Sequence, residues 1–345
     1  MERAQYEEKS LKRLRAVARK PVTQGALVRE GELTPGRSFP VLLEPAAADV
    51  DLAEWVRGNR ELLRGLLARH GAVLLRGFGV RSEQEFEQVA SGLCPELFGE
   101  YEDLPQAKGA AKVYGSTPYP ADKTILFHNE SSHMHRWPLK QFFCCLTPAL
   151  ARGETPIVDC REIYRDLRPE LLAPFAGKGL RYVRTFVDGL DVSWQAFFHT
   201  DDRGAVEEYC RRSGIRCEWT AEGLRTEQVG PAVAKHPLTG ETVFFNQMQA
   251  HHPSCLDPDL RTPLTSLYGE RGLPRNVLYG DGSPIPDEVV AEIIELYWAH
   301  SVSFPWQAAD VLMLDNMLVA HARNPYQGPR KIVVAMGEMF EKSSL

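Results

Sequence analysis

The sequence predicts a mainly β protein, either a β-sandwich or a jelly roll, with helical additions. From about residue 112 the chain consists of short apolar segments separated by turns that contain glycine or proline, which is typical of these folds rather than of a doubly wound parallel sheet. Before that point, apolar residues recur at helical spacing. We therefore expect a single domain, with an α/β flank at 46–110 and a jelly-roll core at 111–340.

The N-terminal part begins with a lead-in, residues 1–45. Its first residues are charged and helix-prone, and the following stretch PVTQGALVREGELTPGRSFP contains enough proline and glycine to predict an irregular chain. In the flank, DLAEWVRGNRELLRGLLARH and EQEFEQVASGLCPELF have helical spacing. Between them, GAVLLRGF is a short apolar run bounded by glycines, which is typical of a buried strand.

The core is predicted to consist of short strands with helical segments between them. Residues 191–235 and 286–300 have a helical or mixed pattern, and we interpret the first as an insertion within the β framework. The predicted strands are KVYGSTPY, TILFHNE, QFFCCLTPA, TPIVDC, GLRYVRTF, TVFFNQ, DVLMLDN and KIVVAMGEM.

Composition restricts the class of partner. The formal net charge of −6, from 40 basic and 46 acidic side chains, argues against nucleic acid and favours small molecules or proteins. The seven cysteines have irregular spacing and form no CxxC pair, so we expect buried reduced thiols rather than disulfides or a zinc site. The chain has no apolar stretch long enough to cross a membrane and no signal-peptide pattern, which predicts a cytoplasmic protein without membrane association.

The stretch LFHNESSHMHRWP contains four candidate metal ligands, His128, Glu130, His133 and His135. In a strand, residues i and i+2 point to the same side, so His128 and Glu130 can reach one ion while Asn129 faces away. Two histidines and one carboxylate on one face of an octahedron are the ligand set of non-haem iron(II) oxygenases. Because the His-x-Glu pattern is short and arises often by chance, a third ligand from a distant strand is needed to support it.

The stretch FPWQAADVLMLDNMLVAHARNPYQGPRK supplies that support. It predicts a strand that ends at Asp315-Asn316, followed by His321 and then Arg330. Together with the His-x-Glu pattern, these motifs resemble the taurine dioxygenase-like (TauD/TfdA) family. Its pattern is His-x-Asp/Glu, a threonine, W-x-x-G-D-x-x-x-x-D-N, a distal histidine and an arginine. The match spans roughly residues 70–340 and keeps the motifs in order.

The resemblance implies the fold, the cofactors and the principal site residues. The fold would be a double-stranded β-helix, a cupin-like jelly roll, forming one catalytic domain that uses iron(II), 2-oxoglutarate and O2. The resemblance further implies that His128, Glu130 and His321 bind the iron. Thr155 and Arg330 would bind the distal carboxylate of 2-oxoglutarate, for which a guanidinium fork and a hydroxyl group are suitable partners.

Two positions depart from the family pattern. Trp306 and Asp310 match the W…D turn, but Ala309 replaces its glycine, a difference that concerns the local turn only. Where taurine-oxidising members carry a second arginine, this chain has Val334. A small free sulfonate could therefore not be bound here in the same way.

Further polar residues are candidates for the substrate pocket. His133 and His135 follow the predicted strand, so we expect a loop in which they either border the pocket or face solvent. Arg323 either binds a carboxylate or forms a salt bridge near the barrel mouth. The pair His251-His252 is interpreted as structural, although the FNQ segment before it is a candidate pocket wall. The candidate set is Asn129, His133, His135, Asn246 and Arg323.

Within the family, segments such as HNESS and TPIVDCREIY are similar to the syringomycin-type branch. Its members oxidise amino acids, several of them tethered as thioesters to carrier proteins, in natural-product biosynthesis. The resemblance implies hydroxylation of an aliphatic C–H of an amino acid or of an aminoacyl carrier protein, with release of succinate and CO2. The alternatives are desaturation or epoxidation at the same iron centre, and a non-catalytic sensor or regulatory protein on the same fold.

Overall fold

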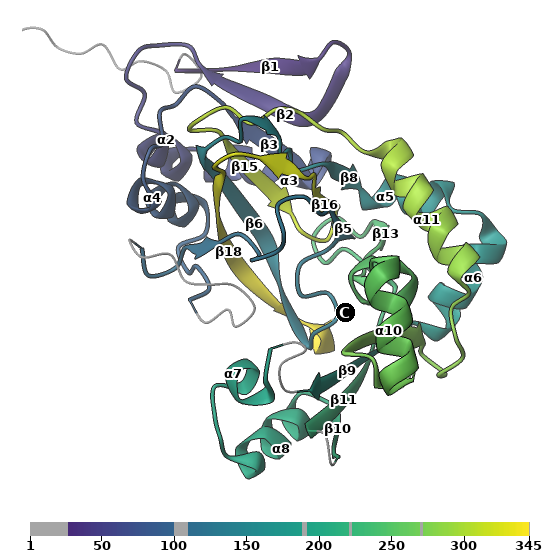
Figure 1. Cartoon of the computed structure of the whole chain (residues 1–345). Helices are drawn as coiled ribbons and strands as arrows, with labels where there is room; N and C mark the ends of the chain where they lie inside the picture. Colours follow the sequence, from purple (N-terminus) through teal and green to yellow (C-terminus); the bar gives the residue numbers. More distant parts are fainter. Residues whose placement is uncertain (1–26, 100–109, 188–191, 221–222, 270–271, 345) are drawn as a thin grey trace, which may run out of the picture.

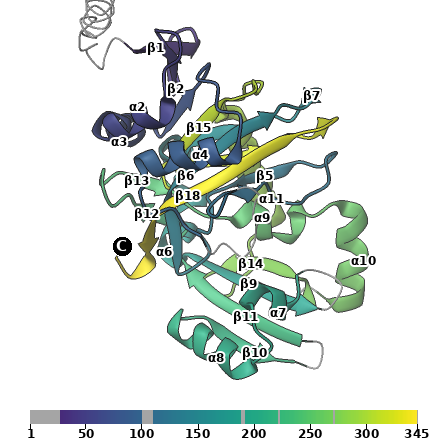
Figure 2. The ribbon, with the colours of Figure 1, turned by 90° about the vertical axis from the view of Figure 1, so that its left-hand side faces the viewer.

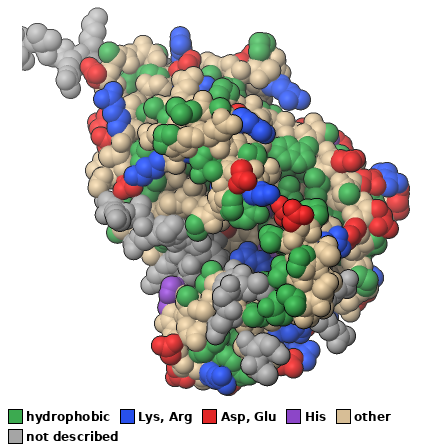
Figure 3. Space-filling model, in the orientation of Figure 1, with side chains coloured by type: hydrophobic (Ala, Val, Ile, Leu, Met, Phe, Trp, Pro, Cys, Tyr) green, Lys and Arg blue, Asp and Glu red, His purple; other side chains and the backbone are tan. Residues whose placement is uncertain are grey.

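The computed structural model describes residues 27–99, 110–187, 192–220, 223–269 and 272–344. The helix predicted within the first twenty residues lies outside these ranges. Figure 1 shows a β core with helices on two sides and a smaller lobe that projects from it. On the face drawn in Figure 3, acidic and basic side chains are interspersed. Among the described residues, no helix is both long enough and apolar enough to cross a membrane.

The core is a jelly roll made of a large and a small sheet. The large sheet has seven strands in the order β1-β2-β3-β15-β6-β18-β4. These strands are β1 (Val28–Thr34), β2 (Arg37–Pro45), β3 (Ala72–Leu75), β15 (Val311–Asp315), β6 (Arg136–Thr147), β18 (Lys331–Glu341) and β4 (Tyr114–Gly115). The small sheet consists of β5 (Ile125–His128), β16 (Val319–Arg323) and β8 (Ile157–Asp159).

Side chains on the two faces of the large sheet belong to two separate hydrophobic clusters. On β15, Leu312 and Leu314 pack in the cluster that includes the small sheet, whereas Val311 and Met313 pack in the cluster formed with the N-terminal helices. Successive side chains of a strand point to opposite faces. Because both faces are covered, the strand is a continuous apolar run rather than an alternating one.

Three helices cover the outer face of the large sheet, α2 (Leu52–Gly58), α3 (Arg60–His70) and α4 (Glu83–Leu93). The sequence predicted one helix over 51–70, but Asn59 interrupts it with a non-helical backbone. Helix α3 ends at Gly71, whose φ of 76° suits glycine. A Cβ at Gly71 would lie 2.6 Å from Cγ2 of Val319, so glycine also permits the close approach of α3 to the small sheet.

The prediction of an irregular lead-in was wrong for its described part. Strands β1 and β2 form an antiparallel hairpin, and β2 pairs in parallel with β3, with Val41 opposite Val73. The reason is the apolar segment that follows the proline- and glycine-rich stretch, because Val41, Leu42 and Leu43 are all buried. This region contains proline and glycine, but they do not prevent the strands from pairing.

The insertion at 191–235 forms most of the projecting lobe. A second, four-stranded sheet in the order β10-β11-β9-β14 carries α7 and α8, and Figures 1 and 2 both place it beside the jelly roll. Only β9 among its strands was predicted individually. The lobe's elements are β9 (Leu180–Val187), α7 (Trp194–Phe198), α8 (Arg203–Arg212), β10 (Arg216–Trp219), β11 (Gly223–Gly230) and β14 (Arg275–Tyr279).

Each of the eight segments predicted as strands contains a strand, and 286–300 contains a helix as expected. The seven cysteines are free and five of them are buried. The remaining helices and strands are β7 (Ala151–Arg152), α5 (Cys160–Asp166), α6 (Pro169–Lys178), β12 (Val233–Lys235), β13 (Thr242–Phe244), α9 (Met248–His251), α10 (Pro258–Tyr268), α11 (Asp287–His300) and β17 (Tyr326–Gln327).

A buried charged cluster lies where β15 ends. Nζ of Lys140 is 2.8 Å from Oδ2 of Asp315, and Nε2 of His236 is 3.1 Å from the same oxygen. The other carboxylate oxygen accepts hydrogen bonds from the backbone N–H groups of Met317 and Leu318. Burial by itself would raise the pKa of Asp315, but Lys140 and His236 outweigh it and lower the pKa to about 2.

We predict that Asp315→Asn destabilises the protein by about 3–5 kcal/mol, because the buried charge of Lys140 loses its 2.8 Å partner and keeps only Glu338, whose Oε2 lies 3.7 Å away. A pKa below the ordinary 3.8 means that Asp315 contributes this stability above that pH and loses it as the pH falls towards 2. Urea unfolding at several pH values should therefore show the largest difference near neutrality. The matched control is Glu292→Gln, which breaks the exposed pair with Arg168 and should change stability little. Equal effects of the two variants would contradict the prediction.

Candidate metal centre

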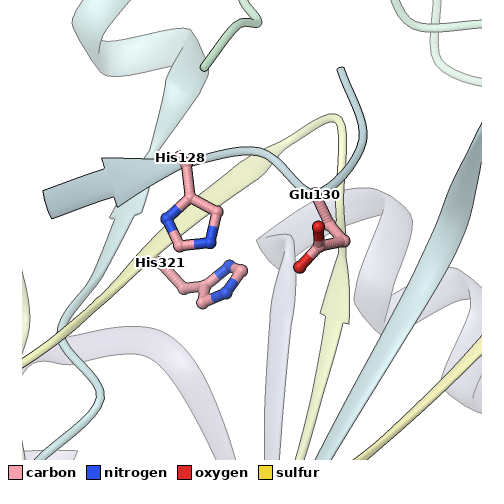
Figure 4. A group of neighbouring side chains, drawn as sticks. All are labelled: His128, Glu130 and His321. Carbon is pink, nitrogen blue, oxygen red and sulfur yellow. The ribbon is translucent and has the colours of Figure 1, made fainter. Parts of the chain in front are cut away.

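Two histidines from paired strands form one side of the candidate metal centre. His128 ends β5 and His321 lies in β16, and the two residues are direct partners in the antiparallel register. Side chains of directly opposed residues lie on one face of a sheet, so the pairing itself brings the imidazoles together. Their ring centroids are 4.3 Å apart, and Figure 4 shows both rings beside the carboxylate of Glu130. One ligand atom from each of the three residues lies within 4.8 Å of the others.

Glu130 reaches the site by a different route from the one predicted. We expected His128 and Glu130 on one strand face, but β5 ends at His128 and Glu130 lies in the following turn. Asn316 holds this turn: its Oδ1 accepts a hydrogen bond from the N–H of Glu130 at 2.7 Å. Its Nδ2 donates to the backbone oxygens of Glu130 and Pro138, both at 2.9 Å. The hydrogen bonds of the Asn316 amide thus take the place of the backbone hydrogen bonds that a longer β5 would make.

Neighbouring groups orient the three candidate ligands. Nε2 of Gln141 donates to Oε2 of Glu130 at 3.3 Å. Nδ1 of His128 lies 2.9 Å from the carbonyl oxygen of Leu126, a contact that places the proton on Nδ1 and leaves Nε2 available for a metal. Burial, and next the charge of His128, lower the pKa of His321 well below its ordinary value, so its imidazole is neutral, as a metal ligand must be.

The donor set fits iron(II). Two imidazoles and one carboxylate match the facial triad of non-haem iron oxygenases and leave positions for other ligands. The atom Nδ1 of His321 is buried and has no hydrogen-bond partner among the described residues. A site without thiolates is less suited to structural zinc, which favours a closed tetrahedral set with cysteine.

Arg330 and Thr155 line the same pocket as the three candidate ligands, and the space within it, open solvent included, is about 450 Å3. Nη2 of Arg330 is 3.5 Å from Oγ1 of Thr155, and Nε of Arg330 donates to the carbonyl oxygen of Gly153 at 2.9 Å. Gly153 has a φ of 79°, and a Cβ there would lie 3.2 Å from Cδ of Arg330. Glycine therefore leaves room for the arginine side chain.

Arg330 presents an uncompensated positive charge to this pocket. Burial, followed by the nearby charge of Arg323, lowers the pKa of Arg330 to about 10, so the guanidinium is still protonated at neutral pH. Within the described part of the chain, no acidic side chain forms an ion pair with it. A carboxylate ligand would offset the unfavourable burial of this charge.

The W…D turn, which runs from Trp306 to Asp310, holds the side chain of Thr155 in position. Nε1 of Trp306 donates to Oγ1 of Thr155 at 3.1 Å. Ala309 adopts a φ of 72°, so the chain keeps the left-handed conformation that the family's glycine allows. Arg76 donates to both oxygens of Asp310, at 2.9 and 2.7 Å, which closes the turn against β3. Sequence reasoning did not single out Arg76, because a single arginine after an apolar strand has no distinctive pattern.

The predicted substrate-pocket residues lie in three different settings. Asn129 and Asn246 are buried in the interior, where Nδ2 of Asn129 donates to the carbonyl oxygen of Asn316 and its Oδ1 accepts from the N–H of Asn246. Neither asparagine is among the residues that line the two pockets described here. The side chain of Asn129 therefore fixes the turn that follows β5, whereas Nδ2 of Asn246 donates to the carbonyl oxygen of Ala232 and its Oδ1 accepts from the N–H of Met248.

Arg323 borders the metal pocket but is engaged with the backbone. Its Nη1 donates to the carbonyl oxygen of Tyr119, and its Nη2 donates to those of Pro120 and Lys123. The salt bridge considered from the sequence is not what the structure shows. Arg323 instead holds the loop that leads into β5, and its pKa is lowered by burial.

His133 and His135, the two further candidate histidines, lie in different surroundings. His135 packs against Tyr209 of α8, with ring centroids 5.9 Å apart, and lines neither of the two pockets. His133 lines a second pocket together with His251, and the space within this pocket, open solvent included, is about 410 Å3. His252, by contrast, is structural as predicted, because its ring nitrogens contact Ser254 and the carbonyl oxygen of Ile285.

We predict that Asn316→Ala lowers the affinity for iron(II) by about 10- to 100-fold, because the turn that carries Glu130 loses its side-chain anchor. The affinity can be measured by anaerobic titration of the metal-free protein. Asn59→Ala is the matched control, since Asn59 donates to the carbonyl oxygen of Trp55 far from the site. If both variants bound iron(II) like the unmodified chain, Asn316 would have no positioning role.

Comparison with known proteins agrees with this geometry. The family model described as "Taurine catabolism dioxygenase TauD, TfdA family" matches residues 32–336. The chain is 38% identical over 306 residues to dapdiamide synthesis protein DdaC of Enterobacter agglomerans, covering 88% of this chain and 92% of the relative. It is 30% identical over 327 residues to a clavaminate synthase-like protein of Arabidopsis thaliana, covering 87% and 94%.

Two solved structures show the same fold. PvcB of Pseudomonas aeruginosa has a TM-score of 0.53 at 14% identity, with 90% of each chain covered. A putative α-ketoglutarate-dependent taurine dioxygenase of Burkholderia xenovorans has a TM-score of 0.52 at 17% identity, with 90% and 89% covered. At these identities the likeness concerns the jelly-roll fold, whereas the family model and the sequence relatives establish descent. The chain belongs to the TauD/TfdA family of iron(II)- and 2-oxoglutarate-dependent dioxygenases.

Proposed function

We propose that this dioxygenase hydroxylates an aliphatic C–H bond of an amino acid, or of an aminoacyl group tethered to a carrier protein, in natural-product biosynthesis. The observation that carries the oxygenase chemistry is the convergence, in one pocket, of three candidate iron ligands and a partly buried arginine that forms no ion pair with a described residue. The similarity to a dapdiamide synthesis protein supports a role in natural-product biosynthesis.

His128, Glu130 and His321 would hold the iron, and the rest of the pocket would hold the co-substrate. When iron(II) and 2-oxoglutarate are bound, the centre uses O2 to oxidise the substrate, and 2-oxoglutarate is converted into succinate and CO2. Arg330 would grip the distal carboxylate of 2-oxoglutarate through its guanidinium fork, with the hydroxyl group of Thr155 as a second donor. The hydrogen bond from Trp306 keeps that hydroxyl in place.

The apolar walls of the same pocket restrict what else can bind there. Ile125, Phe143, Ile332 and Val334 line it, so part of its surface is apolar. Val334 offers no charge, so a free sulfonate finds no second cation at this position. This agrees with a substrate whose acid group is absent, as in a thioester, or is bound elsewhere.

We predict that the protein with iron(II), ascorbate and 2-oxoglutarate releases succinate slowly, and faster with its substrate. Glu130→Ala should abolish both the release and tight binding of iron(II), since it removes the carboxylate ligand. Glu170→Ala, at an exposed position of α6, serves as the control and should retain activity. Wild-type turnover by the Glu130 variant would overturn the proposal. Mass spectrometry of free and carrier-bound amino acids then tests whether one oxygen atom is added to either.

A second prediction concerns the co-substrate. Arg330→Met should raise the KM for 2-oxoglutarate by about 10- to 100-fold, because a charge-assisted hydrogen bond to the distal carboxylate is lost. The neighbouring Lys331 pairs with Glu83 and is more than half exposed, so Lys331→Gln should leave this KM unchanged. Binding of iron(II) should be the same in both variants. An unchanged KM in the Arg330 variant would place the co-substrate carboxylate elsewhere.

A further inference from the structure

Gln141 is a polar side chain on an otherwise apolar face of β6. Side chains at every second position of a strand share one face, so Leu139 and Phe143 are its neighbours along the strand. Its register partners on the adjacent strands are Leu314 and Met336. These four residues belong to the hydrophobic cluster that includes the small sheet, and Gln141 itself is 1% exposed. The sheet therefore surrounds this amide with apolar side chains.

Only one end of the Gln141 amide is satisfied by the described residues. Nε2 of Gln141 donates to Oε2 of Glu130 at 3.3 Å. A carboxylate that binds a metal only accepts hydrogen bonds, so the NH2 group must be the end that faces Glu130. The other end, Oε1, is shielded from solvent and has no hydrogen-bond partner within the described part of the chain. A buried polar atom without a partner is unfavourable, so a functional reason for this glutamine is expected.

The carboxylate of Glu130 receives a donor at each of its two oxygens. The N–H of Ser131 donates to Oε1 at 3.2 Å, and Gln141 donates to Oε2. Ser131 has a φ of 55°, a left-handed conformation that is uncommon for residues other than glycine and that is concentrated at functional sites. The donor from Ser131 belongs to the turn itself, whereas the donor from Gln141 belongs to β6. Gln141 therefore connects the carboxylate to the large sheet.

The unsatisfied oxygen of Gln141 belongs to the metal pocket. Gln141 lines this pocket together with the three candidate ligands. A facial triad leaves three coordination positions, of which 2-oxoglutarate takes two when its carboxylate and keto oxygens chelate the iron. A water molecule at the third position is a hydrogen-bond donor, and Oε1 of Gln141 is an acceptor that lacks one. The two needs are complementary.

We propose that Gln141 is a positioning residue of the iron centre that uses both ends of its amide. Nε2 fixes the carboxylate of Glu130, and Oε1 accepts a hydrogen bond from the water molecule at the coordination position that 2-oxoglutarate leaves. This hydrogen bond retains the water until the substrate enters, so that the position O2 needs stays filled in the absence of substrate. The proposal rests on the proposed iron ligands, because it assigns a role to the neighbour of one of them.

Two apolar variants and one matched control test this role. Gln141→Met keeps the length of the side chain and removes both hydrogen-bonding groups, and Gln141→Leu has no sulfur atom that can bind the metal. Gln249→Met is the control, since Gln249 of α9 is 3% exposed, its Oε1 also lacks a described partner, and it lines neither pocket. Urea unfolding of the metal-free proteins should show that all three variants fold cooperatively.

The first measurement uses cobalt(II), a probe that reports coordination without turnover. A five-coordinate cobalt(II) ion absorbs visible light more strongly than a six-coordinate one. With cobalt(II) and 2-oxoglutarate, the unmodified chain and Gln249→Met should absorb weakly. Gln141→Met and Gln141→Leu should absorb several-fold more strongly, because the water is no longer retained. A merely structural defect would instead release cobalt to solvent, where the hydrated ion is six-coordinate and absorbs weakly.

Two further measurements follow the two ends of the amide separately. Anaerobic titration of the metal-free proteins should show that both Gln141 variants bind iron(II) about tenfold more weakly, since the Glu130 carboxylate loses a donor that fixes it. At saturating iron(II), their slow succinate release without substrate should rise several-fold above that of the unmodified chain, because O2 finds its position open. A structural defect would lower this rate.

The proposal would be overturned by cobalt spectra of both Gln141 variants that stay as weak as that of the unmodified chain, or by an equal change in Gln249→Met. Glu130→Ala in the same titrations separates this result from the ligand assignment. If Glu130→Ala bound cobalt(II) like the unmodified chain, the proposed ligands would be wrong. If Glu130→Ala lost cobalt(II) while both Gln141 variants behaved like the unmodified chain, the ligands would stand and the role of Gln141 would fail.

Discussion

The antiparallel pairing of β5 with β16 is the constraint on which the candidate metal centre depends. It makes His128 and His321 direct partners, so two ligands that are far apart in the sequence meet without any loop having to position them. The small sheet is held in turn by its packing against the large sheet in one hydrophobic cluster. A site built on a sheet in this way inherits the rigidity of the core, which a metal centre with a fixed ligand geometry requires.

The third ligand needs a polar anchor because the sheet ends before it. Asn316 satisfies the backbone of Glu130 from the end of β15, and the adjacent Asp315 binds Lys140 and His236 in the same buried layer. A buried polar network of this kind is costly unless every member is satisfied. Its location beneath the Glu130 turn explains why the strand ends with two polar residues at an otherwise apolar position. Stability and metal geometry are therefore coupled at this point.

The sequence predicted those features that follow from periodicity or from motif order. The strands of the core and the convergence of His128 with His321 belong to this group. The position of Glu130 could not be predicted, because the i, i+2 rule assumes that the strand continues, and only the tertiary bond to Asn316 ends it. The hairpin of β1 and β2 was missed for a similar reason: its pairing with β3 is a long-range contact that local proline and glycine content does not reveal.

The four-stranded sheet of the lobe illustrates the same limit. Arg184 and Arg275 are far apart in the sequence and have no shared motif, and only the register of β9 with β14 brings their charges together. The iron ligands occupy the rigid jelly roll, whereas these arginines belong to the lobe formed largely by the insertion. One short turn carries both Glu130 and His133, so the metal centre and the second pocket are adjacent along the chain and share one structural support.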